Sequence, residues 1–386
     1  MSLVGLMGVW LMLLALPVAS NHRRTDQLLV FLALAALHIA SSVFYWKYSL
    51  SNPADSRFYF FAPSEWLHLD VTSGTILTVQ LIDSLKSSLG GSYLDYFLLF
   101  QAFSFWGIAV LLRTSNEIHA EYGILPNGLA WFPLFIPSLH FWTSAIGKDS
   151  PLFLAVSLAV WSAMRLRSRL PFMAGALLLM VLFRPHVAFV TAVSLAVAAL
   201  LGGGTAPLAR IGLICLSIIG MAATAVSVER SLPVELSSPS SVGAFLDQVQ
   251  SREKLTDGAT TISGLSYPSR LFSLLFRPFF IDANGLLGIA ASIENLFVVG
   301  VVFSLISNWR LLLWLFRSSF LVRFVSVFTV IMLILLSMVY YNVGLGLRQR
   351  TMVFSTLFVL LTVLWAVRRA FASQPATVPS RVEESI

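Results

Sequence analysis

The sequence predicts an all-α membrane protein, a polytopic bundle of about eleven spanning helices. Of its 386 residues, 57% are hydrophobic and only 11% are charged, whereas ordinary soluble domains carry roughly 25% charged residues. Apolar runs near the length of a membrane span recur along the whole chain. The polar stretches between them are too short to form a soluble domain that carries the function alone. Lipid is therefore the expected solvent for most of the chain.

The apolar runs define the expected spans. They fall near 2–19, 28–45, 93–112, 124–142, 151–164, 171–183, 187–202, 211–228, 286–307, 324–341 and 352–367. Several are shorter than the roughly 17–25 residues of a typical spanning helix. The pair 171–183 and 187–202 is separated only by Arg184-Pro185-His186, so it predicts either two helices or one broken helix. The first run has no basic residues before it, which favours a spanning helix over a cleaved signal peptide.

The positions of the arginines predict the orientation of the bundle. Cytoplasmic loops of membrane proteins carry an excess of lysine and arginine. One set of alternate connections holds only arginines as its basic residues: Arg23, Arg24, Arg113, Arg165, Arg167, Arg169, Arg210, Arg310, Arg317, Arg323, Arg368, Arg369 and Arg381. These connections are expected in the cytoplasm, which places the N-terminus outside and the C-terminus inside. The bundle then covers 1–369, and the polar tail 370–386 is expected to be disordered in the cytoplasm.

Two longer connections, 46–92 and 229–285, are expected on the outer face of the membrane. After Ser73, apolar residues recur at near-helical spacing: Ile76, Val79, Ile82 and Leu85. This pattern predicts a helix that lies on the outer membrane surface.

Composition and motifs exclude several classes of function. The net charge of +7 and the pI near 9.8 come from basic residues scattered between apolar runs, which does not indicate nucleic-acid binding. The single cysteine, Cys215, excludes an internal disulfide or a cysteine-based zinc site. The six histidines show no metal-ligand spacing, and Gly202-Gly203-Gly204 lacks the lysine of a phosphate-binding loop. No metal and no cofactor are therefore expected.

Five cations lie beside spans on the predicted outer face, where the charge rule disfavours them: Lys148, Arg184, Arg277, Arg348 and Arg350. Arginine binds phosphate well because its planar guanidinium makes two parallel hydrogen bonds. The set therefore favours a site for an anionic ligand at the outer surface. The alternative is that each cation reaches lipid headgroups or pairs with a nearby acid.

Polar residues accompany these cations at the predicted span ends. His140 and Asp149 flank Lys148, and His186 follows Arg184 after one proline. At these span ends, cations therefore lie close in sequence to groups that can accept or donate a proton.

Two carboxylates stand out by position. Glu294 lies inside a predicted span, where a carboxylate is costly and usually faces the bundle interior, so it is expected either to pair with an arginine or to serve function. Asp55 lies just beyond the second span, on the outer side. It is either a general base for an acceptor hydroxyl or a solvated aspartate in the turn after Pro53.

At these residues the sequence resembles the GT-C class of membrane glycosyltransferases. The pair Asp55 and Tyr59 resembles the acidic motif in the first loop of that class. The segment from Pro137 to Asp149 resembles a later loop that opens a span, and Phe183-Arg184-Pro185 and Leu347-Arg348-Gln349-Arg350 look like further recurring features. The set is also similar to bacterial exopolysaccharide and O-antigen polymerases. It departs from many GT-C enzymes in placing the acidic motif after the second span instead of the first.

The resemblance implies a GT-C-like bundle in the bacterial inner membrane that acts on a saccharide linked to polyprenyl phosphate or pyrophosphate. Membrane lipids and other polysaccharide-assembly proteins are the further partners it implies. Asp55 would act as the base, assisted by His140 or His186. Lys148, Arg184, Arg348 and Arg350 would hold the phosphate, and Asp149, Arg277 and Glu294 complete the expected substrate-binding set.

Two other functions fit parts of the pattern. A flippase for the same lipid-linked glycan would share the substrate, but transporters often show internal repeats and charges near the midplane. The sequence shows no repeat, and its charges gather at one face. A membrane phosphatase of the phosphatidic-acid type is suggested by Arg184-Pro185 and by Pro137 to His140, but these elements occur in reversed order and the last element is missing.

Overall fold

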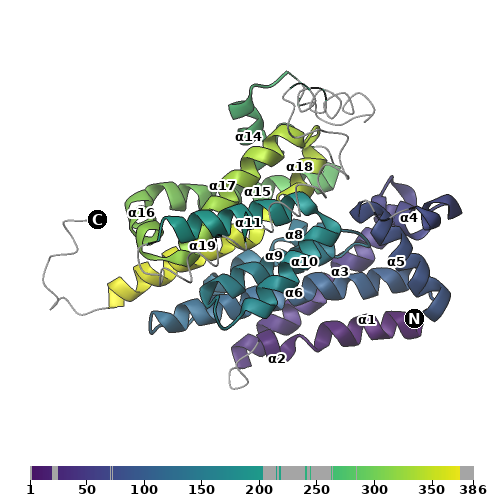
Figure 1. The fold of residues 1–386 in the computed structure, drawn as a ribbon, viewed down its shortest axis with the longest axis horizontal. Helices are drawn as coiled ribbons and strands as arrows, with labels where there is room; N and C mark the ends of the chain where they lie inside the picture. Colours follow the sequence, from purple (N-terminus) through teal and green to yellow (C-terminus); the bar gives the residue numbers. More distant parts are fainter. Residues whose placement is uncertain are drawn as a thin grey trace, which may run out of the picture.

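In the computed structural model, the chain forms an elongated bundle whose long helices run roughly along one axis (Figure 1). The structure describes residues 2–19, 25–69, 71, 73–202, 264–283 and 285–373, with a few isolated positions between 203 and 263. Every regular element within these residues is a helix. The all-α prediction is therefore confirmed for the described part of the chain.

Five helices in the described residues are long and apolar enough to cross a membrane: α3 (Thr25–Ser51), α6 (Tyr93–Glu121), α15 (Gly285–Ser307), α17 (Phe320–Val339) and α19 (Thr351–Ser373). Each lies where the sequence predicted a span. The predicted number of about eleven stays a prediction. The predicted span 211–228, most of the loop 229–285 and the tail beyond 373 lie outside the described residues.

Four further predicted spans are shorter apolar segments in the structure: α1 with α2, α9 (Asp149–Met164), α10 (Leu170–Phe183) and α11 (Pro185–Leu200). The first run is divided into α1 (Leu3–Leu13) and α2 (Leu16–Ala19). Pro17 explains the division, because its ring clashes with the carbonyl four residues earlier and it lacks an N–H group.

The runs 171–183 and 187–202 form two helices that fold back on each other, α10 and α11. Arg184 leaves the helical conformation between them, with φ of −149° and ψ of 82°, and Pro185 begins α11. The hydroxyl of Thr191 lies 3.2 Å from the sulfur of Met180, which places the two helices side by side. Arg184 is thereby held at the turn of a helical hairpin.

The predicted span 124–142 is not one continuous helix. It consists of α7 (Gly128–Trp131), the 3₁₀-helix η2 (Phe132–Phe135) and α8 (Pro137–Thr143). Pro133 and Pro137 each remove a backbone donor, which explains why the helical ladder is interrupted. The run was recognised as apolar, but its prolines limit each helix to one or two turns.

These short helices return the chain from the end of α6 to the start of α9. Trp131 donates to the side chain of Asn116 near the end of α6, whereas Ser150 at the start of α9 hydrogen-bonds to Phe100 near the beginning of α6. Trp161 at the end of α9 contacts Glu117. Helices α6 and α9 therefore run parallel, and the segment between them passes along the bundle.

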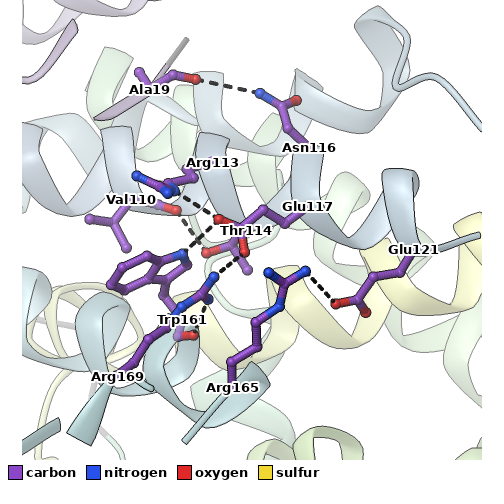
Figure 2. Close-up of polar contacts among 10 residues, drawn as sticks. All are labelled: Ala19, Val110, Arg113, Thr114, Asn116, Glu117, Glu121, Trp161, Arg165 and Arg169. Carbon is purple, nitrogen blue, oxygen red and sulfur yellow. Dashed lines mark hydrogen bonds and ion pairs between the residues drawn. The ribbon is translucent and has the colours of Figure 1, made fainter. Parts of the chain in front are cut away.

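Figure 2 shows the ionic cluster at the C-terminal ends of α6 and α9. Glu117 accepts hydrogen bonds from Arg113 at 2.8 Å and from Arg169 at 2.5 Å. The guanidinium of Arg169 lies over the ring of Trp161, 3.9 Å from its centroid. Some of the arginines that the sequence grouped on one face thus gather at one end of the bundle, and acidic residues of α6 neutralise part of their charge.

The opposite end is formed by short helices that flank the spans: α4 (Asp55–Phe60), η1 (Ser64–His68), α5 (Gly74–Leu89), α14 (Tyr267–Phe276) and α18 (Val343–Gln349). Helix α16 (Trp309–Ser318) connects α15 to α17. The helix predicted after Ser73 is confirmed as α5, and the Ser73 side chain caps it by accepting from Ile76 N–H. Its apolar residues Ile76, Val79 and Ile82 are buried against the protein.

Candidate functional site

A chain of ion pairs links four of the predicted site residues. Arg348 contacts Asp55 through Nη1 and Asp149 through Nε, each at 2.5 Å. Asp149 also pairs with Arg184 Nη2 at 2.6 Å. Together with Lys148, the neighbour of Asp149 in sequence, we call these residues the ion-pair cluster. The structure thus brings together cations that the sequence could place only on a common face.

Helix ends hold each member of the cluster in place. Asp55 begins α4, and Asp149 begins α9. Arg184 lies in the α10–α11 turn, and Arg348 lies in the last turn of α18. A carboxylate in the first turn of a helix also interacts favourably with the helix dipole, as Asp149 does in α9.

Lys148 is the one cation of the cluster that makes no direct ion pair in the described residues. Its Nζ donates to Thr75 Oγ1 on α5 at 2.8 Å. Burial, reinforced by the nearby Arg184, lowers the pKa of Lys148 from 10.5 to about 8. With three cations and two carboxylates, the cluster carries a net charge of +1 near neutral pH.

Arg348 is the electrostatic centre of the cluster. Burial alone would lower its pKa, but Asp149 and then Asp55 outweigh this effect and hold the pKa well above its usual value of 12.5. The guanidinium therefore stays charged under all ordinary conditions.

A second arginine, Arg184, has a buried Nε that hydrogen-bonds to none of the described residues.

A small pocket opens beside Arg348 and Asp55, and aromatic side chains form part of its wall. Tyr45 of α3 and Trp142 of α8 line it, and so does Gly147. Gly147 has φ of 151°, and a side chain there would approach the ring of Tyr59 to 3.1 Å. The glycine thus leaves room at the pocket wall.

A separate apolar cleft of about 330 Å³ is also lined by Trp142. Its walls come from α3, α8 and α15, and its aromatic lining is Phe44, Tyr48, Phe141 and Trp142. Only Glu294 contributes a charge. Trp142 is thus the residue common to a charged pocket and an apolar cleft.

Sequence reasoning missed Tyr45, Thr75 and Trp142. Tyr45 had a detectable signal, since it shares a helical face with His38 and Ser42, which precede it by seven and three residues. Thr75 and Trp142 had none, because only the packing of α5 and α8 brings them to the cluster.

The other predicted residues lie in separate places. His186 lies two residues after Arg184, at the start of α11, and the charges of Arg184 and Lys148 act on its imidazole. His140 is fully buried in the bundle, where it contacts His38 and does not line the pocket. Arg277 pairs with Asp282 at 2.5 Å, apart from the cluster.

Arg350 and Glu294 lie outside the ion-pair cluster. Arg350 donates to the carbonyl of Leu275 and to the Asn295 side chain, both at 2.7 Å, and burial lowers its pKa to about 10. Glu294 accepts from the Ser138 N–H at 2.8 Å, and its second oxygen is buried without a hydrogen-bond partner among the described residues. Glu294 and Arg350 line a common small cavity, and Glu294 also lines the apolar cleft.

The approach of α5 to the end of α10 leads to a testable prediction. A Cβ atom on Gly74 would lie 2.2 Å from the main-chain oxygen of Phe183. Gly74→Ala is therefore expected to separate the two helices, to cost about 1–3 kcal/mol, and to weaken pyrophosphate binding by moving Thr75 away from Lys148. Thermal unfolding and pyrophosphate titration of the purified protein measure both effects. Gly175→Ala is the control, because nothing lies within 4 Å of a Cβ there.

Among the described residues, no group of three or more His, Cys, Asp or Glu side chains is arranged to hold a metal ion. No family model, curated protein or solved structure matches the chain.

Proposed function

We propose that the protein is a membrane glycosyltransferase or glycan polymerase. Its donor is a saccharide linked to polyprenyl phosphate or pyrophosphate at the outer face of the bacterial inner membrane, in exopolysaccharide or O-antigen synthesis. One observation supports the proposal: Trp142 lines both the small pocket beside Arg348 and the accessible carboxylate of Asp55 and the apolar cleft. A lipid-linked sugar has the matching sequence of chemical parts.

The cluster suits a phosphate or pyrophosphate group. Its net charge is +1, and Arg184 Nε is a buried donor that hydrogen-bonds to none of the described residues. Fixed cations at the leaving group stabilise the negative charge that develops there. Lys148 supplies a further donor, because Thr75 occupies only one of its three N–H bonds.

Asp55 is the proposed general base. Its side chain is 56% exposed, whereas that of Asp149 is 7% exposed and fully engaged with two arginines. Asp55 takes the proton of the acceptor hydroxyl while that oxygen bonds to the anomeric carbon of the donor sugar. The bond from the anomeric carbon to the phosphate oxygen breaks, and its electron pair leaves with the polyprenyl phosphate or pyrophosphate.

The apolar cleft accounts for the lipid part of the donor. Helix α15 contributes one wall, and much of its surface is exposed: Leu286, Ile293 and Phe303 are 86%, 58% and 70% accessible. In a membrane these side chains contact lipid, so a prenyl chain can enter the cleft from the side. Trp142 then separates the chain from the phosphate.

The proposal is tested with the full-length protein in nanodiscs and a polyprenyl-pyrophosphate-linked oligosaccharide. The expected result is longer glycan and free polyprenyl pyrophosphate. Asp55→Asn is expected to lower the rate by about 10²–10⁴-fold, the usual contribution of a general base. Glu65→Gln, which changes an exposed acid of the same connection, is expected to retain full activity. If both Asp55→Asn and Arg184→Ala keep the wild-type rate, the proposed function is wrong.

A flippase for the same substrate is the second candidate, and the lateral opening of the cleft favours it. Sidedness separates the two functions in cells. Loss of a polymerase leaves single lipid-linked units on the outer leaflet, whereas loss of a flippase leaves them on the inner leaflet.

A further inference from the structure

Two histidines meet inside the bundle, away from the ion-pair cluster. The Nδ1 atoms of His38 on α3 and His140 on α8 lie 2.9 Å apart, and both side chains are fully buried. His38 occupies the middle of a helix long enough to cross a membrane. An ionisable residue at such a depth is costly, and in membrane proteins it commonly marks a functional site.

The contacts of His140 fix where its proton lies. His140 Nε2 is 2.8 Å from the main-chain carbonyl of Leu134, which can only accept, so Nε2 carries a proton. In its neutral form, His140 then has a bare Nδ1. The 2.9 Å contact requires one proton between the two rings, and His38 must supply it from its own Nδ1. A neutral pair therefore leaves His38 Nε2 without a proton.

The surroundings of His38 Nε2 accommodate a further proton. This atom lies 2.9 Å from the Ser104 hydroxyl and 3.2 Å from the Gln101 carbonyl. In the neutral pair, Ser104 donates to the ring, and the Gln101 carbonyl faces a nitrogen lone pair. When Nε2 gains a proton, it donates to both oxygens, and the Ser104 hydroxyl turns to the Gln101 carbonyl, 3.0 Å away. The singly protonated pair satisfies every polar contact of the two rings.

Further polar groups lie in the same buried region with unused hydrogen-bonding capacity. Both polar atoms of the Gln101 side chain and the Ser42 hydroxyl are buried and hydrogen-bond to none of the described residues. Ser42 is one helical turn from His38, and Gln101 is one turn from Ser104. Such groups can orient toward an added charge or hold water beside it. They offset part of the desolvation cost that burial imposes on a charged imidazole.

No acid neutralises the pair from the helices packed against it in the described structure. Helices α6 and α8 contribute serine, glutamine and threonine to this region, and His140 is the titratable group that acts on His38. The next titratable residue along this face of α3 is Tyr45, two turns away, which lines the pocket beside Arg348. Ser42 lies between them, so polar groups lead from the histidine pair to the pocket.

We propose that the His38–His140 pair is a binding site for one proton in the core of the bundle. The two imidazoles share a proton between their Nδ1 atoms, and the added proton resides on His38 Nε2. The site is independent of the proposed glycosyl transfer, because it rests on side chains that do not touch the ion-pair cluster.

The test is nuclear magnetic resonance of the full-length protein in nanodiscs, with ¹⁵N-labelled histidine, from pH 9 to pH 4. The expected result is one transition in which the signals of His38 and His140 move together, with a total uptake of one proton. His38→Gln and His140→Gln assign the signals, and each is expected to remove the joint transition. His119→Gln is the matched control, since His119 is buried in α6 and bonds to the Ser115 carbonyl instead of a second imidazole.

Ser104→Ala separates a proton site from a purely structural contact. It removes the hydroxyl that donates to Nε2 in the neutral pair and leaves the Gln101 carbonyl to accept from the protonated nitrogen, so the midpoint is expected to rise by about one pH unit, a tenfold gain in proton affinity. The wild-type titration decides the proposal even if a variant fails to fold. Neutral imidazoles down to pH 4, or two separate transitions that take up two protons, would show that the pair is a structural hydrogen bond only.

Discussion

Asp149→Asn is expected to destabilise the protein by about 3–5 kcal/mol and to abolish glycan transfer. The Asp149 side chain is 7% exposed and holds both Arg184 and Arg348. Removing one partner of a buried pair leaves charge uncompensated in a medium of low dielectric constant, which is far more costly than losing a surface pair. Here a single substitution leaves two arginines without their shared carboxylate.

The loss of activity has a separate cause. Without Asp149, Arg184 and Arg348 repel each other, and Asp55 is the one remaining carboxylate of the cluster. Arg348 then binds Asp55 alone, which keeps the proposed base from the acceptor hydroxyl. Equilibrium unfolding in detergent measures the stability, and nanodisc assays with the lipid-linked oligosaccharide measure the transfer.

Asp282→Asn is the control for the effect of breaking an arginine–carboxylate pair. Asp282 holds Arg277 at 2.5 Å, outside the ion-pair cluster. This variant is expected to lose stability but to retain transfer once folded. If Asp149→Asn proves as stable and as active as the wild type, the cluster neither stabilises the fold nor binds the donor.

The sequence predicted much of the fold because lipid imposes a simple pattern. A spanning helix must be apolar over most of its length, so α3, α6, α15, α17 and α19 are visible as apolar runs. The segment 124–142 was predicted as one span, and this was wrong. Hydropathy reports whether a segment prefers lipid to water, but it does not report where the backbone hydrogen bonds of a helix are interrupted. Its prolines were present in the sequence, and giving them more weight would have indicated a broken segment.

The cations of the site were predictable, but their partners were not. The charge rule identified Lys148, Arg184 and Arg348 from their position beside spans. The carboxylate partners of Arg348 lie far away in sequence: Asp149 is 199 residues from it, and Asp55 is 293 residues from it. Such pairings depend on how the helices pack, which one sequence does not record.

Arg348 and Arg350 show that the sequence did not separate the roles of two arginines within one helical turn. Both flank the same predicted span, so the sequence assigned them the same role. Residues two apart in a helix point about 200° from each other. Arg348 accordingly faces Asp55 and Asp149, whereas Arg350 reaches Leu275 and Asn295. The short helix α18 was not predicted, and without it the divergence could not be seen.

Anion binding is expected to weaken as the pH rises through about 8, because Lys148 then loses its charge. Burial and the neighbouring Arg184 lower its pKa to about 8, while Arg348 remains charged. Pyrophosphate affinity of the wild type is expected to fall about tenfold or more between pH 7 and pH 9.5, the loss of one close charge pair. Lys148→Arg keeps its charge and is expected to bind with nearly constant affinity over this range. Lys148→Met is expected to bind weakly at every pH.

As the pH rises, the free energy of unfolding is expected to increase while the affinity for pyrophosphate falls. The pKa of Lys148 is lower in the folded protein than in the unfolded chain, so between about pH 8 and pH 10.5 the unfolded chain binds more protons. The free energy of unfolding then rises with pH in this window, and below pH 8 the buried charge is a constant cost. Lys148→Met removes that cost and is expected to stabilise the protein at pH 7 by about 1–3 kcal/mol, while it loses affinity for pyrophosphate.

Lys86→Met is the control for this pair of effects. Lys86 lies on α5 and donates to the Phe60 carbonyl at 2.9 Å, outside the ion-pair cluster. It is expected to leave both pH profiles unchanged. A gain in stability with a loss of binding, seen only at Lys148, would show that the fold retains an unfavourable buried charge because the ligand requires it. Equal pH profiles for the wild type, Lys148→Arg and Lys148→Met would contradict a role for this amine in anion binding.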